Sequence, residues 1–456
     1  DGFYTFIIFP HISKIKKKPE DIGSIIGENL KLNSDIISAY NVVKGFLNFE
    51  LSNSYLLSIF DHINSHKSWG FKKKNGNDVM IEFSSPNTNK PLHLGHMRNI
   101  FLGYSLSKIL EANGYDVHKV QIINDRGIHI CKSMVAWDLF GNNETPNSSD
   151  IKGDKFVGKF YVMFENEHKR QVTKLVNDGL SMDEANSSTE IMKMAKEVLL
   201  KWENKDKKII SLWKKMNAWV YDGFNKTYDL IEVDFDKNYY ESETYLLGKQ
   251  KIKKGLKDKI FYKEKDNSVW VDLTDEGYDK KILLRSDGTS VYMTQDIGTA
   301  IKRFEDFPSI IKQIYTVGSE QDYHFKILFK ILEKLDYKWA KECFHLSYGM
   351  IDLPSGKMKS REGTVVDADQ LIYDMVETAK KRTNDLGKLD DFDTDDSKVL
   401  YNIIALGALK YFLLKVDPKK RMLFDPEESI DFQGNTGPFI QYTYARIFSI
   451  IKRANF

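Results

Sequence analysis

The stretch that decides the fold is Ser84-Ser85-Pro86-Asn87-Thr88-Asn89-Lys90-Pro91-Leu92-His93-Leu94-Gly95-His96, the histidine loop below. An apolar run at residues 78–83 precedes it, which is typical of a buried strand. A helical pattern follows at 94–112 and stops at Asn113-Gly114, and a second strand is predicted at 116–123. Strand, helix and strand at this spacing predict a parallel pair with a right-handed crossover, the opening of a nucleotide-binding sheet.

The histidine loop has the chemistry of a phosphate site. Backbone N–H groups and the dipole at the N-terminus of the following helix favour an anion. His93 and His96 can both donate hydrogen bonds to an α-phosphate as it becomes pentacoordinate, and Gly95 leaves room for adenine or ribose. The alternative is a polar turn with two incidental histidines. The strand-loop-helix context and the preceding Lys90 favour a nucleotide site.

A second motif is the basic loop, Ser355-Gly356-Lys357-Met358-Lys359-Ser360-Arg361-Glu362-Gly363-Thr364. Cations on a loop flanked by glycine can close over a departing pyrophosphate and stabilise its developing charge. Taken alone, such a run is better explained by a solvated basic surface. The two motifs occur in this order, each beside a predicted strand, and this combination is much more specific than either motif alone.

With both motifs in place, the chain resembles the class I aminoacyl-tRNA synthetases, whose signatures are HIGH and KMSKS. More narrowly, it resembles the arginyl-tRNA synthetase family over nearly its whole length. The segments that carry the resemblance are residues 82–87, 90–99, 124–127, 284–290, 292–298, 318–324, 357–364, 433–438 and 441–446. The resemblance implies a Rossmann-type α/β fold and ATP-dependent activation of L-arginine to arginyl-adenylate. The arginyl group would then pass to the 3′-terminal adenosine of tRNA(Arg), with Mg²⁺ accompanying ATP.

The resemblance also implies roles for particular residues. The catalytic set is Lys90, His93, His96, Lys357, Lys359 and Arg361. The ATP-binding set is Lys90, His93, Gly95, His96, Gly349, Met350, Lys357, Met358 and Ser360. One departure from the family pattern is Ser360, which stands where KMSKS has its second lysine. Lys90, just upstream of the first signature, is expected to supply that charge.

The amino-acid pocket needs a carboxylate, because a guanidinium pairs best with a planar acid. Tyr292 and Asp296 lie four residues apart, on one face of a predicted helical turn. The resemblance assigns both to the guanidinium. It adds Glu82, Ser84 and Gln321 to the lining of the pocket and places Asn87 near the α-amino or carboxylate group. The alternative is that the tyrosine belongs to the core and the aspartate caps a helix.

Three domains are expected. Residues 1–75 form a small α/β domain that touches tRNA in the family, residues 76–396 form the catalytic domain, and residues 397–456 begin a helical anticodon-binding domain. The catalytic domain is expected to carry a mainly helical insertion at about 141–240. We expect the chain to be a fragment, because it opens without Met and closes inside an apolar helical pattern at 438–456.

Composition limits the partners and the compartment. The chain has 456 residues, is 41% hydrophobic and 29% charged, and shows neither a signal peptide nor an apolar run long enough for a membrane span. Cys131 and Cys343 form no metal or disulfide pattern, so no metal centre is expected and a reducing, cytoplasmic compartment fits. The chain is also expected to be a monomer. A net charge of +2 is weak for a nucleic-acid binder, so any such surface must be a local patch, as at Lys14 or Lys415.

Two other functions remain open on the sequence. One is a related nucleotidyltransferase that adenylates a small carboxylic acid without tRNA. This reading leaves the N-terminal unit and the helical C-terminal segment unexplained. The other is a tRNA-binding paralogue that has lost catalysis. Intact Lys90, His93, His96 and Lys357 argue against it.

Overall fold

The computed structural model describes residues 2–352, 366–385, 394–431 and 433–454, so the basic loop lies outside the described residues. The chain divides into two compact units, Asp1–Lys73 and Lys74–Phe456. Each unit is described by itself.

The first unit is a small antiparallel sheet with helices. Strands β1 (Tyr4–Ile7), β2 (Ile37–Val43) and β3 (Phe46–Leu51) pair in the order β1-β3-β2. The helical elements are η1 (Phe9–His11), α1 (Ile12–Ile15), α2 (Pro19–Leu32) and α3 (Asn53–Ser65). Helix α2 lies so close to the sheet that a Cβ on Gly27 would be 2.3 Å from the Tyr40 ring, so this approach requires glycine. Ile22 and Leu47 are buried in the resulting core.

The second unit is built on a five-stranded parallel sheet in the order β11-β10-β4-β5-β6. The strands are β4 (Asp78–Glu82), β5 (Asp116–Ile123), β6 (Lys237–Tyr240), β10 (Ile310–Gly318) and β11 (Cys343–Tyr348). When these five strands are numbered 1 to 5 along the chain, their order across the sheet is 3-2-1-4-5, that of a doubly wound Rossmann sheet. The direction of the strand order reverses between β4 and β10. The predicted fold class is confirmed.

Both faces of this sheet are covered, as an apolar parallel strand requires. Val79 and Ile81 pack in the same apolar cluster as α4 (Leu94–Ala112), whereas Met80 packs on the other face with Val120 and Tyr239. Helix α4 therefore runs directly beneath the sheet, and the histidine loop is fixed between β4 and the first turn of α4.

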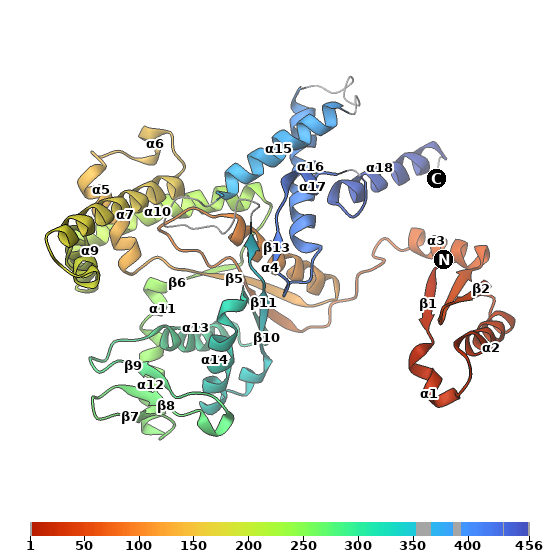
Figure 1. Cartoon of the computed structure of the whole chain (residues 1–456), viewed down its shortest axis with the longest axis horizontal. Helices are drawn as coiled ribbons and strands as arrows, with labels where there is room; N and C mark the ends of the chain where they lie inside the picture. Colours follow the sequence, from red (N-terminus) through yellow and green to blue (C-terminus); the bar gives the residue numbers. More distant parts are fainter. Residues whose placement is uncertain (1, 353–365, 386–393, 432, 455–456) are drawn as a thin grey trace. The chain divides into compact units, whose positions relative to one another are not determined.

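A helical bundle follows β5. Its helices are α5 (Ile128–Phe140), α6 (Pro146–Ser149), α7 (Gly153–Asn177), α8 (Met182–Ser188), α9 (Glu190–Glu203) and α10 (Lys207–Leu230). Figure 1 shows α5, α7, α9 and α10 lying side by side, and Phe156, Phe160 and Phe164 are buried among them. The predicted insertion at 141–240 is mainly helical, but its last four residues are not. They form β6, the edge strand of the sheet. The sequence interpretation did not separate this strand from the insertion, because a short strand following a helix gives no helical or alternating signal of its own.

Three short strands precede the second half of the sheet. They are β7 (Tyr262–Lys263), β8 (Val269–Val271) and β9 (Lys281–Leu284), and they form a separate antiparallel sheet rather than joining the main one. Around them lie α11 (Glu241–Thr244), α12 (Leu247–Lys257), η2 (Thr274–Glu276), α13 (Tyr292–Asp306), η3 (Ser319–Gln321), α14 (Asp322–Lys334) and η4 (Lys338–Glu342). Ile297, Ile327 and Leu332 are buried in the core that these elements share.

The C-terminal segment is helical, with one short strand pair. Its elements are β12 (Ile351–Asp352), α15 (Ala368–Asp385), α16 (Thr394–Leu414), β13 (Met422–Leu423), α17 (Pro426–Ser429) and α18 (Gly437–Arg453). Helix α16 packs against α15 and α4 through Ala405, Ala408 and Leu409, so it shares the core of the sheet unit. The domain boundary placed at 397 stays a prediction. Residues 395–414 are long and apolar enough to span a membrane, with a mean hydropathy of 1.3, but these buried contacts are those of a core helix.

Candidate active site

The histidine loop leaves the carboxyl end of β4 beside the point where the strand order reverses, which is the usual ligand crevice of such sheets. Its first two residues, Ser84 and Ser85, have φ angles of 69° and 47°, a left-handed conformation that is strained for residues with a side chain. The Ser84 N–H donates to Asn99 Oδ1 at 2.5 Å, and Asn99 Nδ2 donates to the Thr316 carbonyl of β10 at 2.7 Å. Asn99 therefore ties the loop to the neighbouring strand.

Polar side chains beneath the loop hold it in place. The hydroxyls of Ser84 and Tyr228 lie 2.7 Å apart, and Ser85 Oγ donates to Glu82 Oε1 at 3.0 Å. The other carboxylate oxygen of Glu82 is hydrogen-bonded and ion-paired with Arg303, and both side chains are buried. The predicted pocket residues Glu82 and Ser84 thus already have partners within the protein.

His93 and His96 face each other at the start of α4. Gly95 N–H donates to His93 Nδ1 and His93 N–H donates to His96 Nδ1, both at 3.1 Å, and the ring centroids lie 3.8 Å apart. An Nδ1 atom that accepts a hydrogen bond carries no proton, so each neutral ring has its proton on Nε2.

The surroundings keep both rings neutral. Burial, reinforced by the charge of Lys90, lowers the pKa of His93 to about 3. Burial and the charges of His93 and Lys90 hold the pKa of His96 well below its ordinary value. At neutral pH the loop therefore offers two uncharged Nε2–H donors.

Lys90 is the nearby cation. Burial lowers the pKa of its ammonium group, and within the described part of the chain no carboxylate pairs with it. The adjoining Pro91 rests on α7, where a Cβ on Gly158 would lie 2.8 Å from Pro91 Cδ. The helical bundle therefore supports the loop from one side and leaves the Lys90 charge available to an anion.

The basic-loop residues Lys357, Met358, Lys359, Ser360 and Arg361 lie outside the described residues. The chain on its C-terminal side returns directly to the histidine loop. Leu94 N–H donates to the Val366 carbonyl at 3.2 Å, Ala368 N–H donates to the Leu92 carbonyl at 3.0 Å, and His93 and Asp367 form an antiparallel bridge.

On the N-terminal side of the basic loop, Gly349 and Met350 follow β11 at the same edge of the sheet. The fully buried Arg98 of α4 donates to the carbonyls of Gly349 at 2.8 Å and of Lys420 at 3.0 Å. A Cβ on Gly349 would lie 2.6 Å from the Lys420 backbone, so this close approach requires glycine. The histidine loop and the Gly349–Met350 segment therefore lie at the same carboxyl edge of the parallel sheet.

The predicted arginine ligands lie at the start of α13. Tyr292 is 78% exposed, so it is not a core residue. Asp296 Oδ2 lies 2.6 Å from His324 Nε2, on the first turn of α14. Gln321 is exposed in η3, directly after β10, and Asn87 forms a bridge with Asn124 beyond the end of β5.

Glu241 is a carboxylate that the sequence interpretation missed. It begins α11, directly after β6, and burial raises its pKa to about 7. The charges of Asp125 and Asp296 raise it further, while Arg126, with Nη1 3.8 Å from Glu241 Oε1, acts in the opposite direction. An acidic residue at the carboxyl end of a sheet strand is a signal, but only once β6 has been recognised as a strand.

Asp125 fixes the position of this acidic group. Its carboxylate accepts from Ser242 N–H at 2.8 Å and from the Tyr221 hydroxyl at 3.1 Å. Its backbone carbonyl accepts from Trp213 Nε1 at 2.5 Å. The end of β5, helix α10 and the start of α11 are thereby joined next to Glu241.

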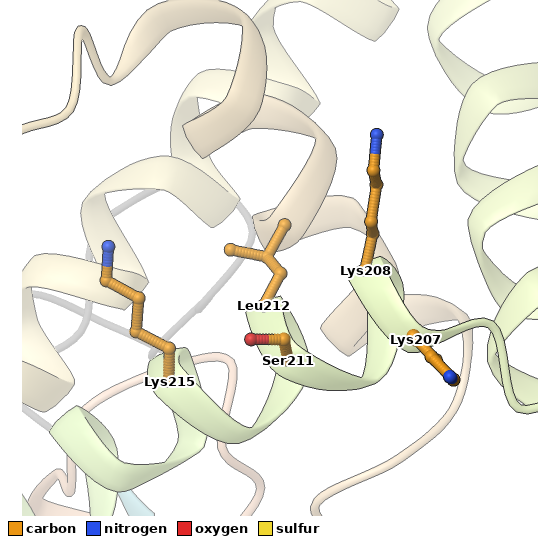
Figure 2. Close-up of a pocket in the computed structure, with 5 residues that line it drawn as sticks. All are labelled: Lys207, Lys208, Ser211, Leu212 and Lys215. Carbon is orange, nitrogen blue, oxygen red and sulfur yellow. The ribbon is translucent and has the colours of Figure 1, made fainter.

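Two other features bear on ligands. Among the described residues, no three His, Cys, Asp or Glu side chains gather as a metal site. Figure 2 shows a hollow on α10 lined by Lys207, Lys208, Ser211, Leu212 and Lys215. None of the predicted site residues lines it.

Comparisons with known proteins identify the family of the chain. The family described as tRNA synthetases class I (R), catalytic domain, matches residues 59–425. A curated arginine–tRNA ligase of Flavobacterium psychrophilum is 54% identical over all of this chain and 78% of its own length. One from Bacteroides thetaiotaomicron is 53% identical over all of this chain and 76% of its own length.

Solved structures share the fold. The arginyl-tRNA synthetase of Thermus thermophilus superposes with a TM-score of 0.72 at 21% identity, covering 100% of this chain and 77% of that one. The arginyl-tRNA synthetase of Plasmodium falciparum gives a TM-score of 0.68 at 21% identity, covering 99% and 75%.

Proposed function

The chain belongs to the arginyl-tRNA synthetases of class I, and on that premise we propose which of its residues carry the reaction. The enzyme is an arginine–tRNA ligase, which activates arginine with ATP and charges tRNA. Membership of this family excludes a nucleotidyltransferase that works without tRNA, and the relatives are ligases rather than inactive paralogues.

We assign the histidine loop to the phosphates of ATP. The single observation that carries this proposal is the pair of neutral rings with Nδ1 bound to the backbone and Nε2–H left to donate. As the arginine carboxylate attacks the α-phosphorus, charge grows on the non-bridging oxygens, and fixed donors stabilise it without reorganising. Lys90 supplies a positive charge beside them, in keeping with Ser360 standing in place of a lysine.

The basic loop would complete the phosphate site. Its lysines and Arg361 are proposed to stabilise pyrophosphate as the bond between the α- and β-phosphates breaks. Gly349 and Met350, at the end of β11, are proposed to contact the adenosine, because they share the sheet edge with the loop that holds Gly95. The arginyl-adenylate is then attacked by a ribose hydroxyl of the tRNA 3′-terminal adenosine, and AMP leaves.

The guanidinium site is proposed to be the acidic group formed by Asp296 and Glu241, with Tyr292 beside it. The charge of Asp296 raises the pKa of Glu241, which means that the two carboxylates repel each other when both are ionised. A guanidinium between them would relieve this repulsion and donate hydrogen bonds to both planar carboxylates. A ligand that lacks the charge would fill the site without relieving this repulsion, which costs about 1–3 kcal/mol.

The remaining pocket residues fall into two groups. Asn87 and Gln321, at the ends of β4 and β10, are proposed to contact the α-amino and carboxylate groups of arginine. Glu82 and Ser84 are proposed to act by holding the loop, because Arg303 and Tyr228 already engage their polar atoms.

Cofactor, assembly and location complete the proposal. Mg²⁺ is proposed to enter on the phosphates of ATP, as is usual for this ion. A monomer is proposed, and a cytoplasmic location is proposed because charging of tRNA serves protein synthesis. Residues 1–75 and 397–456 are proposed to contact tRNA outside the acceptor end.

The test is aminoacylation by the full-length protein with arginine, lysine and citrulline as competing substrates. Charging with arginine, and loss of at least roughly 10²-fold in kcat/KM with either analogue, is expected from a paired guanidinium site. Equal charging with citrulline would refute the acidic pocket. Pyrophosphate exchange should be measured with and without tRNA(Arg), because we expect little adenylate without it.

A further inference from the structure

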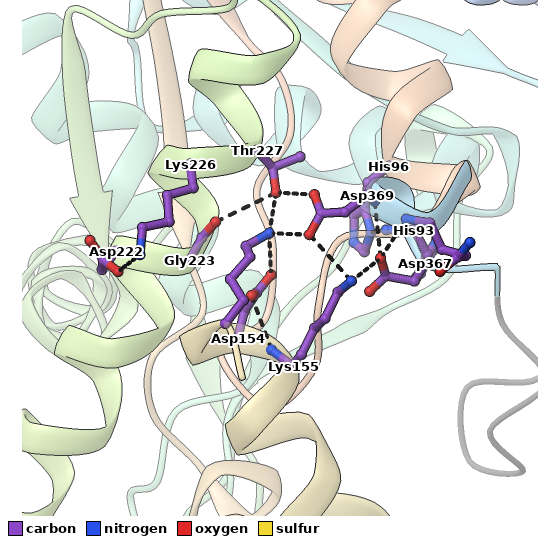
Figure 3. Close-up of polar contacts among 12 residues, drawn as sticks. His93, His96, Asp154, Lys155, Asp222, Gly223, Lys226, Thr227, Asp367 and Asp369 are labelled. Carbon is purple, nitrogen blue, oxygen red and sulfur yellow. Dashed lines mark hydrogen bonds and ion pairs between the residues drawn. The ribbon is translucent and has the colours of Figure 1, made fainter. Parts of the chain in front are cut away.

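An ion-pair cluster joins the helical bundle to the segment that follows the basic loop. The cluster consists of Lys152, Asp154, Lys155, Asp367 and Asp369, and it is named the latch cluster here. Lys152 Nζ lies 2.5 Å from Asp369 Oδ2, and Lys155 Nζ lies 3.0 Å from Asp367 Oδ1. Figure 3 shows Lys155 of α7 pointing at both aspartates near His93.

Thr227 of α10 is hydrogen-bonded to two members of the latch cluster. Its Oγ1 donates to Asp369 Oδ1 at 2.8 Å, and Lys152 Nζ donates to Thr227 Oγ1 at 2.5 Å. Gly223, one turn earlier on α10, is required because a Cβ there would lie 2.5 Å from Asp154 Oδ1. Helices α7 and α10 are therefore shaped to hold these carboxylates.

The charged side chains of the latch cluster are largely buried, so each one needs an oppositely charged partner. The Lys152 side chain is 17% exposed, that of Asp154 is 0% exposed and that of Asp369 is 21% exposed. Burial alone would raise the pKa of Asp369, but the hydrogen bond and charge of Lys152 hold it below the ordinary value. A buried ion pair is weak evidence for stability, because desolvation offsets much of its Coulombic gain, so the pairing is weighed by the geometry that it fixes.

The latch cluster is connected to His93 through Asp367. The Asp367 carboxylate accepts from the N–H groups of Asp369 at 2.9 Å and of Gln370 at 3.1 Å, while its backbone bridges to His93. Lys155 therefore pairs with the residue that lies against the catalytic histidine. A shift of this segment would move the His93 backbone, whose N–H also orients the His96 ring.

We propose that the latch cluster positions His93 and His96 for their contact with ATP by fixing residues 366–369 to helices α7 and α10. This inference rests on the proposed function of the histidine loop. Lys152, Lys155 and Asp369 are positioning residues, because they act through Asp367 rather than on the substrate. Displacement of a donor by a fraction of an ångström lowers the rate of the chemical step more than it weakens substrate binding.

The test uses Lys152→Met, Asp369→Asn and the double variant in the full-length protein with tRNA(Arg) present. Each single change is expected to lower kcat of arginine-dependent pyrophosphate exchange on the order of 10-fold, with KM for arginine unchanged. The double variant is expected to lose little more than either single one, because the two side chains act as a unit. The matched control is the exposed pair of Asp222 and Lys226 on the same α10, also drawn in Figure 3, whose Asp222→Asn and Lys226→Met changes should leave kcat unaltered.

A milder change covers the case in which these variants fail to fold. Thr227→Val removes the hydrogen bonds of Thr227 Oγ1 with Asp369 and with Lys152 at nearly constant volume, and it should lower kcat in the same direction. A lower melting temperature with unchanged kcat would overturn the proposal, since that is the signature of a purely structural contact. If His93→Ala also leaves exchange unchanged, the proposed function of the loop has failed; if only the latch variants do, the latch alone is wrong.

Discussion

His93 and His96 lie with their ring centroids 3.8 Å apart, and each accepts a backbone N–H on Nδ1. This arrangement settles the tautomer of both rings and gives them the same role. Neither can act as a cation at neutral pH, because burial lowers both pKa values far below 7. In the proposed reaction, the positive charge would therefore come from Lys90 and the basic loop, while the histidines would supply directed hydrogen bonds.

The first prediction concerns the identity of the donor atom. His96→Ala should lower kcat of pyrophosphate exchange by roughly 10²–10³-fold, the usual loss for one oxyanion donor. His96→Gln places an amide N–H near the position of Nε2, whereas His96→Asn places one near Nδ1. We therefore expect the Gln variant to retain more activity than the Asn variant. The reverse order would show that Nδ1 faces ATP, and His62→Ala, in the first unit, serves as the control.

The second prediction concerns Asp296. Asp296→Asn keeps the shape of the side chain and removes its charge, so KM for arginine should rise on the order of 10²-fold while kcat changes much less. The preference for arginine over citrulline should fall by a similar factor. Steady-state aminoacylation measures both quantities. Asp275→Asn, on the exposed η2, is the matched control, and an unaltered KM for Asp296→Asn would remove this residue from the pocket.

The third prediction concerns pH. With its pKa raised to about 7, Glu241 is protonated below that pH and ionised above it. Since the guanidinium needs the ionised form, KM for arginine should fall as pH rises through 7 and then level off. Binding should also release protons, which calorimetry in buffers of different ionisation enthalpy would detect.

The neighbours of Glu241 predict the result of replacing it. Glu241→Gln cannot titrate, so KM should be raised and should no longer change near pH 7. The groups that face this side chain are Arg126, Asp125 and Asp296. A pH profile that persists unchanged in the Gln variant would assign the titration to another group.

The fourth prediction concerns stability in acid. The pKa of His93 is lowered to about 3 in the folded state, below the ordinary value of 6.5, so the unfolded chain binds more protons in this window. Stability is therefore present above pH 6.5 and is lost as pH falls toward 3. At pH 5.5 the depressed pKa of His93 should lower the free energy of unfolding by about 1 kcal/mol, measured by denaturant unfolding at pH 7.5 and 5.5.

Variants separate this effect from other titrating groups. The double variant His93→Asn and His96→Asn should lose less stability between the two pH values than the unaltered protein does. Equal slopes for the two proteins would contradict the low pKa values of the loop histidines.

The sequence alone determined the sheet fold and the family, and it singled out the histidine loop that is proposed to bind ATP. Strand β5 and helix α4 begin and end at the predicted residues, because a continuous apolar run and an Asn-Gly stop are local signals. The strand-loop-helix order then fixes the crossover and brings the loop to the carboxyl edge of the sheet. The functional family follows from segments whose chemistry is contained within a few consecutive residues.

Only the tertiary structure decided which groups face one another. Glu241 escaped the sequence interpretation because β6 is four residues long and is recognised as a strand only by its pairing with β5. Asp369 and Lys152 lie far apart in the chain, and nothing local indicates that they meet. Local signals determine elements, whereas the pKa of a carboxylate and the partner of a buried ion depend on charges that the fold brings within a few ångströms.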